Sequence, residues 1–409
     1  MDRIQVVVRA SALHDPASME RLKRDLLHGI ANELSVPVHE AREPKENDLT
    51  AIVVLTGGVE REVLKLASNL PSPVLLIAHG GHNSLPAALE ILARIRQDGG
   101  EGRILFGTPQ QIAVELDREI RIAGAWHRLR FSRVGLIGEP SDWLISSDVD
   151  RAFLRGRLGI ELVSISIDEL VDRASSVRPN RSDVSRFTKE ADATAEVSKS
   201  DLRQAVAVYE ALRALVDEHR LSACAVRCFD VIQRLRNTGC YALSRLNDEG
   251  VASACEGDMQ SLFGLYIARL LTGTTGFMGN IASVDSKRNA VTVTHCSCPL
   301  SLASGYAIRS HFESGLGVGI QARVASGPCT LFRFGGERLG HLFLREGTLR
   351  DAPLRDDLCR TQLVAVTDGP LNELLIAPLG NHHIVLPGRH GATIRLFFDR
   401  YFRAGLPLH

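Results

Sequence analysis

The 409-residue sequence predicts an α/β protein in which two parallel-sheet domains precede a β-rich C-terminal domain. Over the first third, continuously apolar strands alternate with amphipathic helices, which is typical of a parallel sheet covered on both faces. The alternation restarts at residue 133. After residue 276 polar and apolar side chains alternate within strands separated by turns, as in an antiparallel sheet or barrel. We therefore expect domains over 1–132, 133–276 and 277–409.

The first domain shows both patterns clearly. An amphipathic helix is predicted over residues 17–33, with Met19, Leu22, Leu26, Leu27 and Ile30 as its apolar residues. Residues 51–55 are wholly apolar and end at a Thr-Gly-Gly turn, which predicts a buried strand. The expected strands are 4–8, 51–55, 73–78 and 103–107, and the expected helices are 17–33, 59–69 and 84–97.

The later elements follow the same patterns. In the central domain the expected strands are 133–139, 159–165 and 224–228, and the expected helices are 201–219 and 257–272. In the C-terminal domain the expected strands are 289–296, 317–324, 329–334 and 341–347, residues 361–377 continue that style, and 390–403 is an expected helix. Residues 174–200 are rich in Ser, Asp and Arg and are expected to form a surface loop. Ser198 and Asp201 are a candidate capping box for the helix that follows.

Composition excludes several classes of protein. The 48 basic side chains balance 48 acidic ones, which argues against a nucleic-acid binder with a global positive field. No apolar run approaches the roughly 20 residues that cross a bilayer, and the apolar N-terminal stretch is too short for a signal peptide. Eight cysteines are too few for a disulfide scaffold, so buried reduced thiols are expected. We expect a soluble cytoplasmic protein without nucleic-acid or membrane partners.

Four islands of polar residues interrupt apolar surroundings. They are 254–259 with Glu256 and Asp258, 275–285 with Asn280 and Asp285, 293–299 with His295, and 378–386 with His382 and His383. Together they offer oxygen and imidazole ligands, a mixture that suits Mn²⁺ or a similar divalent ion better than thiolates would. Such an ion can hold two adjacent hydroxyl or carbonyl oxygens and act as a Lewis acid.

Each island also has a structural explanation. Carboxylates near a helix N-terminus often serve as caps, which would account for Glu256 and Asp258. A turn at Gly279 and Asn280 would need no function. A lone histidine such as His295 is more often a satisfied core or loop residue. Adjacent histidines in a strand point to opposite faces, so at most one of the pair at the fourth island serves a given site.

The islands in this order resemble the L-fucose isomerase and L-arabinose isomerase superfamily, especially its shorter fucose-isomerase-like members. The resemblance covers the whole chain and is strongest from 250 to 390. The matching segments are 255–259, 276–280, 294–299 and 380–383, with 138–144 and 311–315 in addition. The resemblance implies an aldose–ketose isomerase with two Rossmann-like α/β domains and a β-rich domain. It also implies a bound divalent ion, commonly Mn²⁺, and a trimer or hexamer with its site between domains and often between subunits.

The resemblance assigns ligands residue by residue. Glu256 matches the first carboxylate of the family, and His295 matches the histidine that arabinose isomerases use. His382 or His383 matches the C-terminal histidine, and the adjacent pair leaves both alignments open.

One position departs from the family. Asn280 stands where the second carboxylate is expected, and an amide oxygen can bind a metal but cannot act as a base. Asp285 and Asp258 are candidate replacements. For a cis-enediol proton transfer between C2 and C1, Glu256 is our first candidate and Asp285 our second.

The substrate and the function class have alternatives. Candidate contacts to sugar hydroxyls are Asn83, Arg309, His311, Glu313 and Arg323. Fucose, arabinose, another pentose or an anionic hexose such as sulfoquinovose is compatible with the family, and an anionic sugar would require a cationic clamp. A non-catalytic sugar-binding or regulatory protein of the same fold is the main alternative. Another metal-dependent sugar enzyme, such as an epimerase, is a third.

Overall fold

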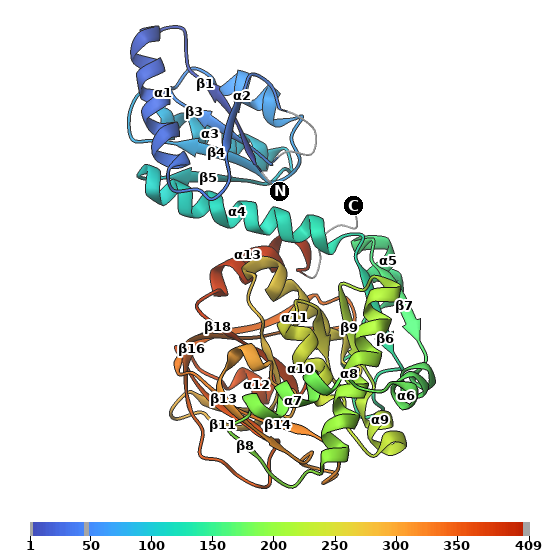
Figure 1. Cartoon of the computed structure of the whole chain (residues 1–409). Helices are drawn as coiled ribbons and strands as arrows, with labels where there is room; N and C mark the ends of the chain where they lie inside the picture. Colours follow the sequence, from blue (N-terminus) through green and yellow to red (C-terminus); the bar gives the residue numbers. More distant parts are fainter. Residues whose placement is uncertain (1–2, 45–48, 404–409) are drawn as a thin grey trace. The chain divides into compact units, whose positions relative to one another are not determined.

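A computed structural model describes residues 3–44 and 49–403 and confirms the predicted α/β class (Figure 1). The chain forms two compact units, with the boundary between Trp126 and His127. The first unit contains a parallel sheet, and the second contains another parallel sheet and a closed antiparallel barrel. No helix in these described ranges is both long and apolar enough to cross a membrane.

The sheet of the first unit has the strand order β2-β1-β3-β4-β5, and all its pairs are parallel. Its strands are β1 (Ile4–Arg9), β2 (Val38–Ala41), β3 (Leu49–Val54), β4 (Val74–Ala78) and β5 (Gly102–Phe106), and the helices are α1 (Pro16–Ala31), α2 (Glu60–Ala67), α3 (Ser84–Gln97) and α4 (Pro109–Leu129), which crosses the boundary. Ala51 and Val53 of β3 pack in the core that includes α1 and α4, whereas Ile52 and Val54 pack with α2 and α3. Burial on both faces is the reason why β3 and β4 are almost wholly apolar.

The second parallel sheet has the order β10-β9-β6-β7. Its strands are β6 (Arg133–Ile137), β7 (Glu161–Ile165), β9 (Ala223–Val226) and β10 (Ala252–Ala254), and the helices of this region are α5 (Arg151–Leu158), α6 (Ile167–Ser176), α8 (Lys199–His219), α9 (Cys228–Leu235), α10 (Cys240–Asp248) and α11 (Met259–Thr272). Because the strands are parallel, the chain leaves β6, β9 and β10 at one edge, through Gly138, Arg227 and Cys255. The capping box of Ser198 and Asp201 at the start of α8 is confirmed.

Residues 174–200 do not form the expected surface loop. They complete α6 and then form α7 (Arg181–Glu190) and β8 (Ala193–Thr194), which pairs with a strand of the C-terminal region. Phe187 explains the error, since its ring is 1% exposed and stacks on Tyr241 with 3.8 Å between the centroids. One buried aromatic side chain thus anchors a helix whose other residues are mostly polar.

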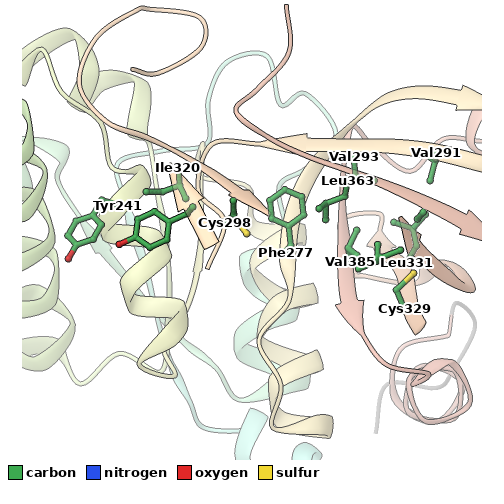
Figure 2. Packing of buried hydrophobic residues seen from close by; sticks show 14 of the residues in the cluster. Tyr241, Phe277, Val291, Val293, Cys298, Ile320, Cys329, Leu331, Leu363 and Val385 are labelled. Atoms are coloured by element: carbon green, nitrogen blue, oxygen red, sulfur yellow. The ribbon is translucent and has the colours of Figure 1, made fainter. Parts of the chain in front are cut away.

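Strands of the C-terminal region close into an antiparallel barrel in the order β11-β12-β17-β16-β15-β18. They are β11 (Phe277–Asp285), β12 (Ala290–His295), β15 (Gly327–Gly335), β16 (His341–Asp351), β17 (Thr361–Thr367) and β18 (His382–Pro387), while β13 (Ala303–Arg309) and β14 (Gly319–Val324) form a separate sheet with β8. The region also contains the helices η1 (Leu300–Leu302), α12 (Glu373–Ile376) and the expected C-terminal helix α13 (Gly391–Tyr401). Figure 2 shows Phe277, Val293 and Val385 in the barrel core, which continues to Tyr241 and Ile320 outside the barrel.

Other local expectations need correction. Gly279 and Asn280 lie inside β11 rather than in a turn. A Cβ at Gly279 would lie 2.7 Å from Cγ1 of Val293 and 2.9 Å from the ring of Phe277, so close packing requires this glycine. The strand pattern expected over 361–377 ends with β17, and α12 follows it. The predicted elements also did not include α4 or β2, a short edge strand with exposed polar residues.

Candidate metal centre

Glu256 lies at the carboxyl edge of the second parallel sheet, two residues after β10. Its backbone φ of 61° is in the left-handed region, which residues other than glycine rarely adopt. The Ser141 N–H donates to the Glu256 carbonyl at 2.9 Å, and a Cβ at Gly257 would lie 2.8 Å from the carbonyl oxygen of Glu139. The loop after β6 therefore holds Glu256 in a strained conformation of the kind that is common at functional sites.

The barrel brings two imidazoles to this carboxylate. His295 ends β12 and His382 begins β18, and both rings are buried. The Nε2 atom of His382 lies 3.5 Å from Oε1 of Glu256, and the Nε2 atom of His295 lies 3.9 Å from the same oxygen. One ligand atom from each of the three residues lies within 4.8 Å of the others. The group therefore has the size and the donor set of a metal centre.

The other nitrogen of each imidazole already has a partner. Nδ1 of His382 lies 2.9 Å from Oδ2 of Asp258, and Nδ1 of His295 lies 2.8 Å from the hydroxyl of Ser297. Outer contacts of this kind orient a metal-binding histidine and fix which nitrogen stays available. Nε2 of His382 is buried and has no hydrogen-bond partner in the described part of the chain. A buried ring nitrogen that has no hydrogen-bond partner and faces a carboxylate is suited to binding a divalent cation.

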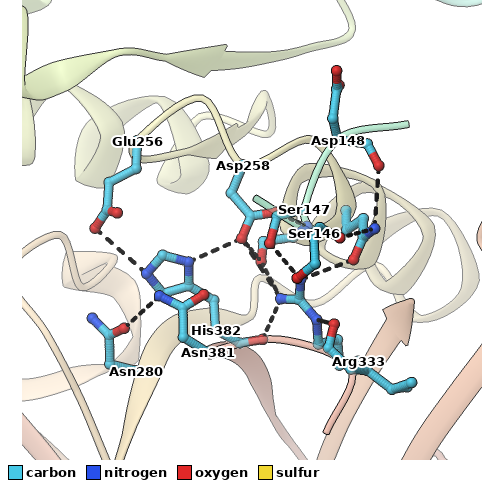
Figure 3. Close-up of polar contacts among 12 residues, drawn as sticks. Ser146, Ser147, Asp148, Glu256, Asp258, Asn280, Arg333, Asn381 and His382 are labelled. Carbon is cyan, nitrogen blue, oxygen red and sulfur yellow. Dashed lines mark hydrogen bonds and ion pairs between the residues drawn. The ribbon is translucent and has the colours of Figure 1, made fainter. Parts of the chain in front are cut away.

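Arg333 supports the group from behind, as Figure 3 shows. Its side chain is 1% exposed, and its guanidinium donates to the His382 carbonyl, the Ser147 hydroxyl and the Gln260 side-chain oxygen at 2.5, 2.8 and 2.9 Å. It also lies 3.6 Å from Oδ2 of Asp258, which in turn caps α11. Arg333 thus ties the start of β18 to α11 and to the segment after β6.

The electrostatics of the group favour positive charge between its members. Burial by itself would raise the pKa of Glu256, but the imidazoles of His295 and His382 hold it well below its usual range. Burial would lower the pKa of His382, yet Asp258 and Glu256 raise it to about 9. A proton or a metal ion at Nε2 meets the same attraction, which is the behaviour expected of a metal ligand.

Two further expected ligands lie close to this group along the chain or across the sheet. Asn280 belongs to β11, which pairs with β18, and His383 follows His382 in β18 itself. Asn280 is opposite His382 in the pairing of β11 with β18, and its Oδ1 accepts from Asn381 at 3.0 Å. His383 points to the other face of β18, as strand alternation requires. It packs edge-on against Phe343 of the barrel core at 5.2 Å, and burial lowers its pKa to about 3. His383 is therefore separated from the ligand atoms that His382 faces.

Asp285, our second candidate base, is not brought to this group. It lies at the far end of β11, five residues or about 16 Å along the strand from Asn280. Its carboxylate accepts from the backbone N–H groups of Lys287 and Arg288 and closes the hairpin. Asp258, the other replacement that we considered, instead orients His382.

The expected sugar contacts divide into three kinds. His311 is 7% exposed, its pKa is lowered to about 4 by burial and then by His295, and the pKa of Glu313 is raised by burial and then by Glu256. Both therefore lie within electrostatic reach of the metal group. Arg309 is bound to Glu196, and Arg323 is a largely exposed partner of Asp192. Asn83 belongs to the first unit, at the N-terminus of α3.

Sequence reasoning gave no role to several residues that contact the group, Trp143 and Arg333 among them. The indole Nε1 of Trp143 donates to Oε2 of Glu256 at 2.6 Å. The segment 138–144 had been noted only for its resemblance to the family. Arg333 could have been recognised from the sequence. An arginine between Phe332 and Phe334 in a buried strand must find its hydrogen-bond partners inside the protein.

Comparison with curated proteins finds sulfoquinovose isomerases. The chain is 27% identical over 284 residues to the enzyme of Alkalicoccus urumqiensis, 27% over 305 residues to that of Clostridium sp. (strain MSTE9) and 22% over 299 residues to that of Priestia megaterium. The first alignment covers 67% of this chain and 64% of the relative, and the other two cover 69% and 66%. The chain thus spans about two thirds of the length of the curated relatives it matches. No protein-family model matches it.

Proposed function

We propose that this chain is a metal-dependent aldose–ketose isomerase whose substrate is sulfoquinovose or a sugar close to it. The observation that carries the proposal is the buried group of Glu256, His295 and His382, in which both Nε2 atoms face one carboxylate oxygen. The relatives named sulfoquinovose isomerase support both the reaction and the sugar. The same proposal includes a trimer or hexamer, as the family resemblance implies, and the cytoplasmic location that we expect from the composition.

The donor set supports a divalent ion, with Mn²⁺ as the first candidate. Glu256, His295 and His382 would hold it, and Asn280 offers a further oxygen beside His382. Oxygen and imidazole ligands without thiolate suit Mn²⁺. When bound, the ion would polarise two adjacent oxygens of the open-chain sugar and so acidify the proton at C2.

The side chains of the protein would do the rest of the chemistry. Glu256 is the first candidate for moving the proton from C2 to C1, because its carboxylate lies at the centre of the group, facing both imidazoles. Glu313 is a further carboxyl group within electrostatic reach of Glu256, and its raised pKa suits a group that shares a proton with a sugar hydroxyl. Burial of the histidines excludes water from one side of the site.

The test is a metal and product assay on the purified chain. The protein is stripped with chelator, reloaded with Mn²⁺ and incubated in heavy water with sulfoquinovose, L-fucose and L-arabinose. Proton NMR follows deuterium at C2 and the appearance of ketose, and both are expected only with metal, first of all for sulfoquinovose. Metal binding with an epimeric product would identify another metal-dependent sugar enzyme. If the chain binds no metal and catalyses no exchange, the result would favour the binding-protein alternative.

A further inference from the structure

Trp143 combines an exposed ring with a hydrogen bond to a buried carboxylate. Its indole Nε1 donates to Oε2 of the buried Glu256 carboxylate at 2.6 Å, yet 52% of the residue is exposed. A tryptophan that serves only packing buries its ring, while one at a binding surface keeps an apolar face open and its N–H bonded. The exposed ring therefore lies directly beside the candidate metal centre.

The exposure does not come from a loosely held segment. Leu144 is buried, the Gln260 side chain donates to the carbonyls of Ser146 and Asp148 at 2.7 and 3.1 Å, and Arg333 donates to Ser147. Buried contacts therefore fix the chain on the C-terminal side of Trp143. On its N-terminal side, the Ser141 N–H donates to the Glu256 carbonyl.

An aromatic row extends from the indole along the site. Phe229, at the start of α9, meets the Trp143 ring edge-on at 4.8 Å. The ring of His311 meets Phe229 edge-on at 5.7 Å, and His311 is within electrostatic reach of Glu256 and His295. The row therefore forms an apolar wall next to a carboxylate and two imidazoles.

We propose that Trp143 is a positioning and substrate-contact residue of this site: its N–H fixes Oε2 of Glu256, and its exposed face receives the carbon–hydrogen face of the sugar. This proposal rests on the proposed function and deepens it. With Oε2 held by the indole, Oε1 is the oxygen that faces both imidazoles. Polar groups bind the hydroxyls of a sugar, and an aromatic face is suited to the apolar side of its carbon chain.

Two substitutions separate these roles. W143F keeps an aromatic face but removes the donor, and we expect kcat and Mn²⁺ affinity to fall about tenfold with little change in KM, the size of one hydrogen bond to a charged group. W143L removes the face as well, and we expect KM to rise a further fivefold or so. W126F, a change at the other tryptophan of the chain, is the matched control and should leave these constants unchanged within about twofold.

A spectroscopic readout does not depend on turnover. In the W126F chain, Trp143 is the remaining tryptophan, and its emission should be quenched by Mn²⁺ and shifted again by sugar. Calorimetry with Mn²⁺ alone measures metal affinity for every variant. Quenching and a W143F affinity loss without any isomerisation would leave the link between Trp143 and Glu256 standing and overturn the proposed function. Isomerisation with unchanged constants in W143F and W143L would overturn the role of Trp143 alone, and a chain with neither response would overturn both.

Discussion

The two parallel sheets of this chain both have histidines near their carboxyl edges, but the ring nitrogens of those histidines have different partners. In the first unit, His79 follows β4, its Nδ1 accepts from the Gly81 N–H at 3.1 Å, and its Nε2 lies 3.0 Å from the Leu55 carbonyl. In the second unit, His295 and His382 use Nδ1 for support and turn Nε2 toward a carboxylate. A histidine near the carboxyl edge of a sheet is therefore a candidate metal ligand only when one of its ring nitrogens remains available to bind a metal.

The barrel produces this difference. In the second unit, strands β12 and β18 bring their imidazoles to a loop of the parallel sheet and bury the group. At the edge of the first sheet, the neighbouring His82 is exposed, and His79 is only partly buried. Burial matters because it strengthens the attraction between a cation and its ligands.

The largest effect should come from removing the carboxylate of the metal centre. E256Q keeps the shape of the side chain but loses the charge, and we expect Mn²⁺ to be lost and turnover to fall by about 10²–10⁴. Metal content after dialysis and deuterium exchange at C2 measure the two effects. H79Q is the control from the first unit and should retain its Mn²⁺. An E256Q chain that binds Mn²⁺ and turns over like the parent would contradict our assignment of the site.

The next largest effect concerns stability. R333M removes a buried charge that holds β18 against α11. It takes the guanidinium donor from the His382 carbonyl and the nearby cation from the Asp258 carboxylate. We expect a loss of about 3–5 kcal/mol in the free energy of unfolding, measured by urea denaturation. R323M is the matched control, because Arg323 is 67% exposed and its ion pair with Asp192 should contribute less than about 1 kcal/mol. Equal losses in the two variants would show that Arg333 is not a support of the site.

A third effect tests the support of the imidazole. D258N removes the charge that faces Nδ1 of His382, and we expect Mn²⁺ affinity to fall about 10- to 100-fold. The same substitution at Asp285, which closes the β11–β12 hairpin, should leave Mn²⁺ affinity unchanged. Calorimetry on the two variants makes this comparison directly. A loss at Asp285 as large as that at Asp258 would show that distance along β11 is a poor guide to the site.

The fold was largely predictable because its two kinds of sheet have different apolar patterns. Burial on both faces makes residues 51–54 of β3 and the whole of β4 continuous apolar runs, while the barrel strand β12 alternates apolar and polar residues. Helix α7 escaped prediction, since a single buried side chain, Phe187, anchors it. Gly279 was assigned to a turn because nothing in the local sequence reveals that Val293 and Phe277 crowd that position.

The candidate site was predictable in its parts and not in its connections. Glu256, His295 and His382 could be named because polar residues stand out among apolar neighbours. The contact of Trp143 with Glu256 joins residues 113 positions apart, and that of Arg333 with Ser147 joins residues 186 apart. No local pattern encodes such pairs, because they depend on how the loops of the parallel sheet meet the barrel.

The smallest effect concerns Glu196, a partly exposed carboxylate whose pKa is lowered, as is that of the buried Glu256. Arg309 and the Ser310 hydroxyl hold the pKa of Glu196 at about 2, against an ordinary value of 4.5. Because the folded pKa is the lower one, this carboxylate stabilises the fold above pH 4.5 and loses that contribution as the pH falls toward 2. Its side chain is 39% exposed, so the contribution at neutral pH should stay below about 1 kcal/mol.

E196Q removes this titration and provides the measurement. The difference in unfolding free energy between parent and E196Q should be constant above pH 4.5 and shrink toward pH 2, while Mn²⁺ affinity at neutral pH stays that of the parent. A pH-independent difference would show that the Arg309 pair is not what lowers the pKa. A change in Mn²⁺ affinity would instead extend the metal centre beyond the buried carboxylate and its imidazoles to the cluster of Glu196, Ser310 and Arg360.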